Sequence, residues 1–200
     1  GWSAFAVETA NLAKAWDYVD LRFPQAYVGN FQQAALEQDL DVAELMAIAR
    51  RESALYPLAE SRVGARGLMQ VMPSTARVVA RKAGLPWRRS ALYDVDYNVS
   101  LGSRYYRELL DRFEGHRPRA LAGYNAGPHR VDRWIEEPLP VDRWIDSLPF
   151  KETREYVQAV LAYTVIYREQ AGQPARVLSA QEWAADLPLQ IRSAMDSTGG

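Results

Sequence analysis

Residues 41–53 read Asp-Val-Ala-Glu-Leu-Met-Ala-Ile-Ala-Arg-Arg-Glu-Ser, and this stretch decides the fold class. Asp41 is a favourable N-cap residue, because its carboxylate can accept a hydrogen bond from a free backbone N–H of the first helical turn. Apolar residues follow at helical spacing, namely Val42, Leu45, Met46 and Ala49. The spacing predicts a helix that turns one face toward a hydrophobic core.

The same stripe, continued by one turn, reaches Glu52 and Ser53. A carboxylate on the core-facing side of its own helix loses hydration, so burial makes it harder to deprotonate unless a cation pairs with it. The pattern leaves two interpretations open. In the first, Glu52 is a helix-end residue that reaches solvent or pairs with Arg50, Arg51 or another neighbour. In the second, it is a general acid kept protonated near neutral pH in an apolar pocket.

The rest of the chain also has helical spacing, and alternation of β-branched residues is scarce. We expect further helices over about 27–35, 73–83, 96–113, 119–124, 128–135 and 151–171. In this interpretation Asp96 opens the fourth predicted helix, and Ser179-Ala180-Gln181-Glu182 forms a capping box before a last helical turn. The sequence therefore predicts one all-α domain of about eight helices, with short joints and no strand.

Composition excludes several classes of protein. The 200 residues are 48% hydrophobic and 24% charged, which is ordinary for a globular chain and rules out general disorder. With 24 basic and 25 acidic side chains the net charge is −1, which argues against nucleic acid or anionic lipid as the main partner. No apolar run approaches the roughly 18–20 residues of a membrane span, so no integral membrane segment is expected.

Cofactor chemistry finds little support in the sequence. Cysteine is absent, which removes disulfides, thiolate nucleophiles and iron–sulfur clusters. His116 and His129 are the only histidines, they form no paired metal-binding motif, and we expect both on the surface. No glycine-rich phosphate loop ending in Lys-Ser or Lys-Thr is present. We therefore expect no metal and no cofactor.

Two polar turns interrupt the helical pattern. The first is Gly67-Leu68-Met69-Gln70, followed by Val71-Met72-Pro73, in which glycine allows close backbone approach and glutamine offers both a donor and an acceptor. The second is Gly123-Tyr124-Asn125-Ala126-Gly127-Pro128, where one helix ends and the next begins. Each turn alone is typical of an ordinary helix–helix corner.

Taken together with Glu52-Ser53 and the segment 148–157 (Leu-Pro-Phe-Lys-Glu-Thr-Arg-Glu-Tyr-Val), these turns are more specific. Four motifs in this order and spacing resemble the catalytic domain of the soluble lytic transglycosylases, peptidoglycan-cleaving relatives of goose-type lysozyme. The resemblance extends over about residues 20–185. One departure is Gly123, because the family's tyrosine is commonly preceded by alanine.

The resemblance implies a lysozyme-like helical domain with a groove for strands of alternating N-acetylglucosamine and N-acetylmuramic acid. The position that matches the family's single catalytic glutamate is Glu52, which would protonate the glycosidic oxygen and then help the muramoyl 6-hydroxyl close a 1,6-anhydro ring. Groove-lining roles carry over to Ser61, Gln70, Met72, Tyr124, Asn125 and Glu152. For Glu152 a structural ion pair with Lys151 or Arg154 is an equal alternative.

The resemblance also sets expectations about context. It implies a periplasmic enzyme of the bacterial cell envelope, with peptidoglycan glycan strands as substrate and proteins of wall synthesis or remodelling as partners. We expect residues 1–20 to be a junction or helix from an upstream region, 21–185 the catalytic domain and 186–200 a frayed tail. The chain begins at Gly1 without an initiator methionine. This beginning suits a mature form or a fragment, and the family's upstream helical domain is not among these residues.

Two rival functions stay open. One is a hydrolytic muramidase on the same fold, in which water takes the place of the 6-hydroxyl. The other is a non-catalytic peptidoglycan-binding module that retains an enzyme fold. End-versus-middle cleavage, peptide-stem preference and oligomeric state do not follow from the sequence.

Overall fold

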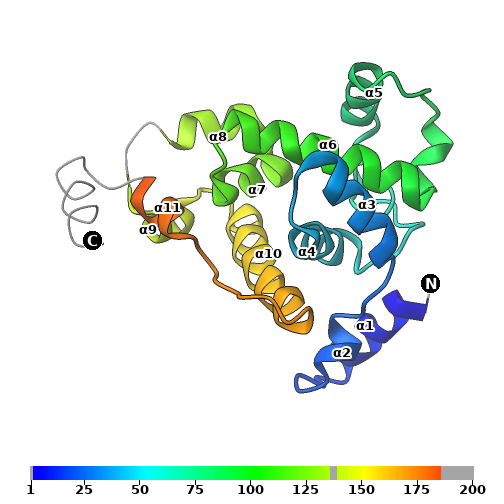
Figure 1. Cartoon of the computed structure of the whole chain (residues 1–200), viewed down its shortest axis with the longest axis horizontal. Coiled ribbons are helices and arrows are strands. Elements are labelled where there is room, and N and C mark those ends of the chain that lie inside the picture. Colours follow the sequence, from blue (N-terminus) through cyan, green and yellow to red (C-terminus); the bar gives the residue numbers. More distant parts are fainter. Residues whose placement is uncertain (1, 136–138, 186–200) are drawn as a thin grey trace.

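The computed structural model describes residues 2–135 and 139–185 (Figure 1). Within these ranges the chain is helical, which confirms the all-α prediction, and the nearest approach to a strand is a pair of isolated bridges in the loop before α5. The expected frayed tail, 186–200, lies outside the described residues. The helices are α1 (Trp2–Leu12), α2 (Val19–Arg22), α3 (Val28–Gln38), α4 (Val42–Ser53), α5 (Pro73–Lys82), the 3-10 helix η1 (Arg89–Tyr93), α6 (Val95–Arg112), α7 (Arg117–Ala126), α8 (Pro128–Trp134), α9 (Val141–Ser147), α10 (Lys151–Gln170) and α11 (Ala180–Ala185).

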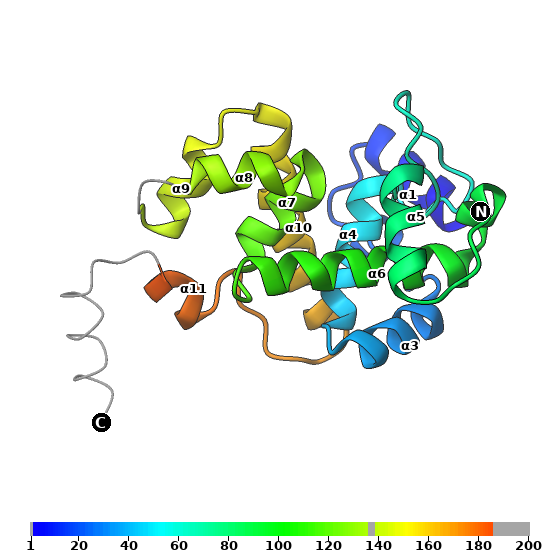
Figure 2. The same cartoon turned by 90° about the horizontal axis from the view of Figure 1, so that it is seen from above.

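Helix α4 lies at the centre of the molecule. It packs along α10 on one side and against α3 on another, while α6 runs across the assembly and contacts α3, α5 and α7 (Figures 1 and 2). Helix α7 in turn packs against α10. This arrangement brings the C-terminal end of α4, the end of α7 and the beginning of α10 to one region. None of the described helices has the length and apolar character needed to cross a membrane.

Burial of α4 goes further than its apolar stripe predicts. Every residue from 43 to 50 is buried, including Glu44 and Arg50. A helix that is enclosed on all sides belongs to the interior of a domain and does not lie on its surface. Arg50 is accommodated because its Nε donates to the carbonyl of Arg22 at 2.5 Å and its guanidinium lies over the rings of Phe23 and Tyr163.

Most helix boundaries agree with the predicted ones, and the differences have local causes. Asp41 is the N-cap of α4, with its Oδ1 accepting from the Ala43 N–H at 2.9 Å. Asp96 does not open α6: Asp94 does, through a 2.9 Å hydrogen bond from the Tyr97 N–H to its Oδ1. Both acids precede the same apolar stripe, so spacing alone could not separate them. The short elements α2, η1 and α9 were not predicted, and none of the three has a side-chain cap.

The prediction that both histidines lie on the surface is wrong for His116. Its side chain is buried, and its Nδ1 accepts from the Arg119 N–H at 3.4 Å, which makes it the N-cap of α7. Its ring also packs edge-on against Trp144. His129 is exposed, as expected. A histidine that caps a helix carries no apolar periodicity of its own, so its burial has no signature in the sequence.

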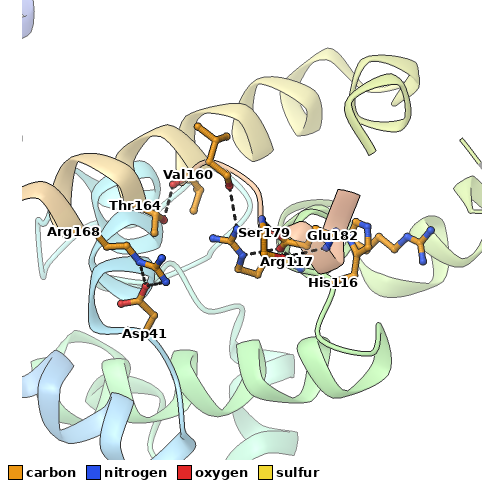
Figure 3. A network of polar contacts seen from close by, with 10 residues as sticks. Asp41, His116, Arg117, Val160, Thr164, Arg168, Ser179 and Glu182 are labelled. Carbon is orange, nitrogen blue, oxygen red and sulfur yellow. Dashed lines mark hydrogen bonds and ion pairs between the residues drawn. The ribbon is translucent and has the colours of Figure 1, made fainter. Parts of the chain in front are cut away.

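The last described helix, α11, is held to the domain by a buried ion pair (Figure 3). Nε and Nη2 of Arg117 donate to Oε1 and Oε2 of Glu182, each at 2.7 Å, and Glu182 is only 4% exposed. Glu182 Oε2 also accepts from the Ser179 N–H at 2.6 Å, while Ser179 Oγ accepts from the Glu182 N–H at 3.1 Å. The reciprocal pair confirms the predicted capping box. Arg117 further donates to the carbonyl of Val177 at 3.0 Å, so the segment before α11 is fixed as well.

We therefore expect Glu182→Gln to lower the free energy of unfolding by about 2–4 kcal/mol, because it leaves the guanidinium of Arg117 without its charged partner. Urea denaturation followed by circular dichroism measures this change. The matched control is Glu108→Gln, which removes an exposed pair with Lys82 and should cost less than about 1 kcal/mol. Equal losses in the two variants would contradict the assignment.

Candidate active site

A cavity of about 340 Å³ opens where the end of α4, the loop before α5, the end of α7 and the beginning of α10 meet. It contains Glu52 together with all six positions that the family resemblance selects as groove-lining. Its lining residues are Arg51, Glu52, Ser61, Val63, Ala65, Gln70, Met72, Tyr124, Asn125, Glu152 and Tyr156. Larger hollows of about 540–590 Å³ lie beside α1 and between η1 and α6, but they do not hold this set.

Glu52 occupies the last turn of α4, at the boundary between the core and the cavity. The side chain is partly exposed toward the cavity, yet protein atoms surround its carboxyl, and this burial raises the pKa from 4.5 to about 7. The Tyr156 hydroxyl and the Arg51 guanidinium lower the pKa by less, and the charge of Glu152 raises it further. The carboxyl can therefore both give and take a proton near neutral pH.

Neither neighbouring arginine forms an ion pair with Glu52 within the described residues. Arg50 donates to the backbone of Arg22 and stacks on rings of the core, as described above. Arg51 lies over the ring of Tyr156, with its guanidinium carbon 5.9 Å from the ring centroid. The interpretation of Glu52 as an arginine-paired helix end therefore does not describe this structure.

The loop at residues 66–70 has a backbone that only glycine can adopt at one position. Gly67 has φ +76°, and a Cβ there would lie 2.2 Å from the carbonyl oxygen of Leu92 and 2.3 Å from Nδ2 of Asn98. Both distances are far below van der Waals contact, and a φ in this range is itself strained for other residues. Gly67 thus lets the loop approach η1 and the beginning of α6 closely.

This loop connects the motifs through backbone carbonyls. Ser53 Oγ donates to the carbonyl of Leu68 at 2.8 Å, directly beside Glu52 in the chain. Tyr124 Oη donates to the carbonyl of Met69 at 2.8 Å. One short backbone segment therefore links the end of α4 to the end of α7.

Gln70 completes the loop from the cavity side. Its Nε2 donates to the carbonyls of Gly67 and Ala59, at 2.9 and 3.1 Å. Among the described residues its Oε1 accepts no hydrogen bond, so this oxygen is available to a donor in the cavity. The amide both shapes the loop and presents an acceptor.

Tyr124 and Asn125 form the α7 side of the cavity. Burial and the nearby charge of Glu52 raise the pKa of Tyr124 well above 10, so its hydroxyl stays protonated and keeps donating to Met69. Asn125 Oδ1 accepts from Thr153 Oγ1 at 2.8 Å, which joins the end of α7 to the first turn of α10. The amide nitrogen of Asn125 is thereby oriented by a hydrogen bond on its oxygen.

Glu152 lies on the α10 side of the cavity, and the two cations proposed as its structural partners are occupied elsewhere. Lys151 lies 3.6 Å from Glu155, and Arg154 donates to the carbonyls of Asp146 and Leu148 at 3.0 and 3.3 Å. The ion-pair alternative for Glu152 is therefore not observed. Its contact with substrate stays a prediction.

Ser61 and Met72 also line the cavity, but only the Ser61 side chain already forms a hydrogen bond within the protein. Ser61 Oγ accepts from the Ala65 N–H at 3.0 Å and closes a tight loop, so its hydroxyl already has a structural use. Met72 is the N-cap position of α5 and is 37% exposed. An exposed thioether at this point offers an adaptable apolar contact to a ligand.

Sequence reasoning missed one residue that touches the candidate acid. Tyr156 lies in the expected helix 151–171 and received no role of its own, yet it is buried with its hydroxyl near Glu52 and lowers the pKa of that carboxyl. Among the described residues this hydroxyl has no hydrogen bond of ordinary geometry, which indicates a loose contact. A signal was present in the sequence, because Tyr156 belongs to the 148–157 motif.

Three residues near the site have a left-handed backbone conformation, as do Lys14, Tyr27, Asp39 and Glu114 elsewhere in the described part of the chain. Ala54 and Leu55, directly after α4, have φ of +51° and +64°, and Gln70 has φ of +46°. Such left-handed conformations are costly for residues other than glycine and cluster at functional sites. In contrast, no group of three or more His, Asp or Glu side chains in the described part of the chain is placed to hold a metal ion.

Comparison with known proteins agrees with the geometry. The sequence model of the transglycosylase SLT domain matches residues 29–145, and that of the soluble lytic transglycosylase helical domain matches residues 147–175. The putative soluble lytic murein transglycosylase of Haemophilus influenzae is 41% identical over 84% of this chain, and the soluble lytic murein transglycosylase of Escherichia coli is 37% identical over 91%. The chain spans 29% of the length of each of these relatives.

Solved structures show the same relationship. An inactive mutant of the lytic transglycosylase Slt from Pseudomonas aeruginosa superposes with a TM-score of 0.86 at 39% identity, covering 88% of this chain and 29% of that one. The 70 kDa soluble lytic transglycosylase of Escherichia coli superposes with a TM-score of 0.88 at 36% identity, covering 91% of this chain and 30% of that one. The chain described here therefore belongs to the transglycosylase SLT family.

Proposed function

We propose that this chain cleaves the β-1,4 bond between N-acetylmuramic acid and N-acetylglucosamine in peptidoglycan, acting in the periplasm and forming a 1,6-anhydromuramoyl end. The observation that carries the proposal is the carboxyl of Glu52, whose pKa is raised to about 7 in a cavity lined by Gln70, Tyr124 and Asn125. Family membership supports the same reaction.

In the first step the protonated Glu52 acts as the acid. Its proton passes to the glycosidic oxygen, the bond from that oxygen to the anomeric carbon breaks, and the N-acetylglucosamine leaves as an alcohol with the bonding electron pair. Positive charge develops at the anomeric carbon. A pKa near 7 suits this task, because an acid whose pKa is close to the working pH is still protonated and still donates readily.

In the second step the ionised Glu52 acts as the base. It takes the proton of the muramoyl 6-hydroxyl while that oxygen forms a bond to the anomeric carbon, which closes the 1,6-anhydro ring and restores the protonated acid. Ordinary glycosidases need a second carboxylate as nucleophile or base. An internal hydroxyl held next to the anomeric carbon replaces it through proximity. One glutamate therefore suffices.

Replacing Glu52 tests this assignment directly. We expect Glu52→Gln to lower the rate of sacculus clearing at least about a thousandfold, because the amide can neither donate nor accept the proton. The matched control is Glu44→Gln, which removes a second buried glutamate of α4 that does not line the cavity and should leave the rate within about twofold.

Mass spectrometry of the products separates the rival functions. A hydrolytic muramidase would release products heavier by one water molecule, with a free reducing end, and would contradict the transglycosylase assignment. If the wild type and both variants bind sacculi but none clears them, the chain is a binding module. Undiminished clearing by Glu52→Gln would show that another group is the acid.

The raised pKa of Glu52 also predicts how stability depends on pH. The carboxyl ionises near pH 4.5 when unfolded and near 7 when folded, so its contribution to stability is complete below about 4.5 and is lost as the pH rises to 7 and above. Glu52→Gln should therefore gain about 2–3 kcal/mol relative to the wild type between pH 4.5 and 7.5, measured by urea unfolding.

Glu44 provides the comparison, because burial raises its pKa to about 7 as well. Glu44→Gln should show a similar gain in relative stability, yet its activity should fall with rising pH as that of the wild type does. A relative stability of Glu52→Gln that does not change over this range would contradict the burial of the Glu52 carboxyl.

A third variant tests the role of Glu152. We expect Glu152→Gln to raise KM about tenfold through the loss of one charged contact to substrate. It should also move the loss of activity at high pH to a lower pH, because a like charge that raises the pKa of Glu52 is removed. Glu155→Gln, on the same helix but paired with Lys151 outside the cavity, should change neither value. The same response from both variants would remove Glu152 from the site.

A further inference from the structure

One buried polar side chain outside the cavity binds both the loop at residues 66–69, which borders the cavity, and the neighbouring helix η1. Asn98, in the first turn of α6, is 1% exposed. Its Nδ2 donates to the carbonyls of Arg66 and Leu92, both at 2.9 Å, and its Oδ1 accepts from the Met69 N–H at 2.8 Å. Both amide hydrogens and the amide oxygen are therefore engaged. Burial of a polar group is favourable only with such partners.

The loop leaves no room for this contact to change. Gly67 lies directly against Asn98, and even a methyl group at Gly67 would collide with Nδ2. On the other side, a Cβ at Gly102 would lie 2.5 Å from Sδ of Met69, so Met69 is packed tightly against α6 as well. The backbone of residues 66–69 is thus fixed against α6 by close packing and by two hydrogen bonds of Asn98, while the third hydrogen bond ties the same amide to η1.

The backbone of Leu68 and Met69 also binds residues of the two motifs that border the cavity. Met69 receives the hydrogen bond of Tyr124 on its carbonyl and gives its N–H to Asn98. The preceding carbonyl, that of Leu68, accepts from Ser53 beside Glu52. Displacement of Met69 would therefore move the attachment points of both motifs at once.

We propose that Asn98 is a positioning residue that sets Glu52 and Tyr124 relative to each other through the loop 66–69. It touches neither the cavity nor substrate, and acts through the backbone of Met69 and Leu68. This inference rests on the proposed function. It assigns a role to a residue that contributes to the reaction by geometry, where a displacement of about 1 Å can cost roughly a hundredfold in rate.

Two substitutions test the role. Asn98→Asp preserves shape and the acceptor for Met69, but turns a carboxylate oxygen toward the carbonyls of Arg66 and Leu92. Asn98→Ala removes all three hydrogen bonds. The matched control is Leu110→Ala, a core truncation on the same helix, twelve residues or about 18 Å away along its axis. All three are assayed at a temperature where circular dichroism shows them fully folded.

If Asn98 positions the site, both of its variants lose at least about thirtyfold in kcat with KM changed less than about threefold, while Leu110→Ala, at a comparable loss of thermal stability, retains kcat within about twofold. If kcat falls no further in the Asn98 variants than in Leu110→Ala, Asn98 is a stabilising residue only and the inference is overturned.

A second readout is independent of cleavage. In the Asn98→Ala background the loosened loop admits water to Glu52, so the pH-dependent stability gain of Glu52→Gln between pH 4.5 and 7.5 should fall by at least half. An unchanged gain would overturn the inference. If the wild type forms no anhydro product, the proposed function fails, and this stability comparison still decides whether Asn98 positions Glu52.

Discussion

The structure depends on the burial of the central turns of α4. Residues 43–50 of this helix are buried between α3 and α10, and the helix ends just where the cavity begins. A carboxyl in its last turn is therefore removed from water by the same packing that forms the core. Removing a carboxyl from water raises its pKa without any specific partner, and this is the largest cause of the raised pKa of Glu52. The chemistry of the site is thus a consequence of where the central helix stops.

The end of α4 requires strained backbone conformations, and contacts of the following loop stabilise them. Ala54 and Leu55 adopt left-handed conformations to turn the chain away, and Gln70 does so again at the far end of the loop. Such positions persist only where surrounding contacts determine them. Here those contacts are the hydrogen bonds to the carbonyls of Leu68 and Met69 and the close packing at Gly67. The strained backbone and the hydrogen-bonded loop are parts of one arrangement.

The sequence was informative wherever a residue acts through its own helix. Asp41 and the capping box at residues 179–182 follow from rules about neighbouring backbone groups, and Glu52 stood out because it breaks the stripe of its helix. The assignment of Asp96 failed because two acids precede the same stripe, two residues apart. The prediction that His116 lies on the surface failed because its burial depends on packing against Trp144, which lies far along the chain.

The residues of the candidate site also fall into those that the sequence predicted and those that it missed. The residues that the family resemblance selects, Glu52 and the six groove-lining positions, all lie on one cavity. Tyr156 and Asn98 were missed because the groups near their polar atoms lie outside their own helices. The amide of Asn98 is hydrogen-bonded to the loop at 66–69 and to η1, whereas the Tyr156 hydroxyl lies near Glu52 without a hydrogen bond of ordinary geometry. Periodicity predicts that such residues are buried but carries no information about what their polar atoms contact. The glycine at position 123 also has a reason that only the folded structure shows, because a Cβ there would lie 3.0 Å from the ring of Phe113.

Two glutamates of α4 separate the effect of burial from the requirements of catalysis. Glu44 and Glu52 both have pKa values raised to about 7, and burial is the largest cause for each. Glu44 faces Arg117 and Tyr106 inside the core, where no substrate can reach it, whereas Glu52 faces the cavity. A raised pKa therefore does not identify an acid catalyst by itself. What distinguishes Glu52 is that the helix ends beside it, so that one side of a desolvated carboxyl is open to a ligand while the other sides remain dry.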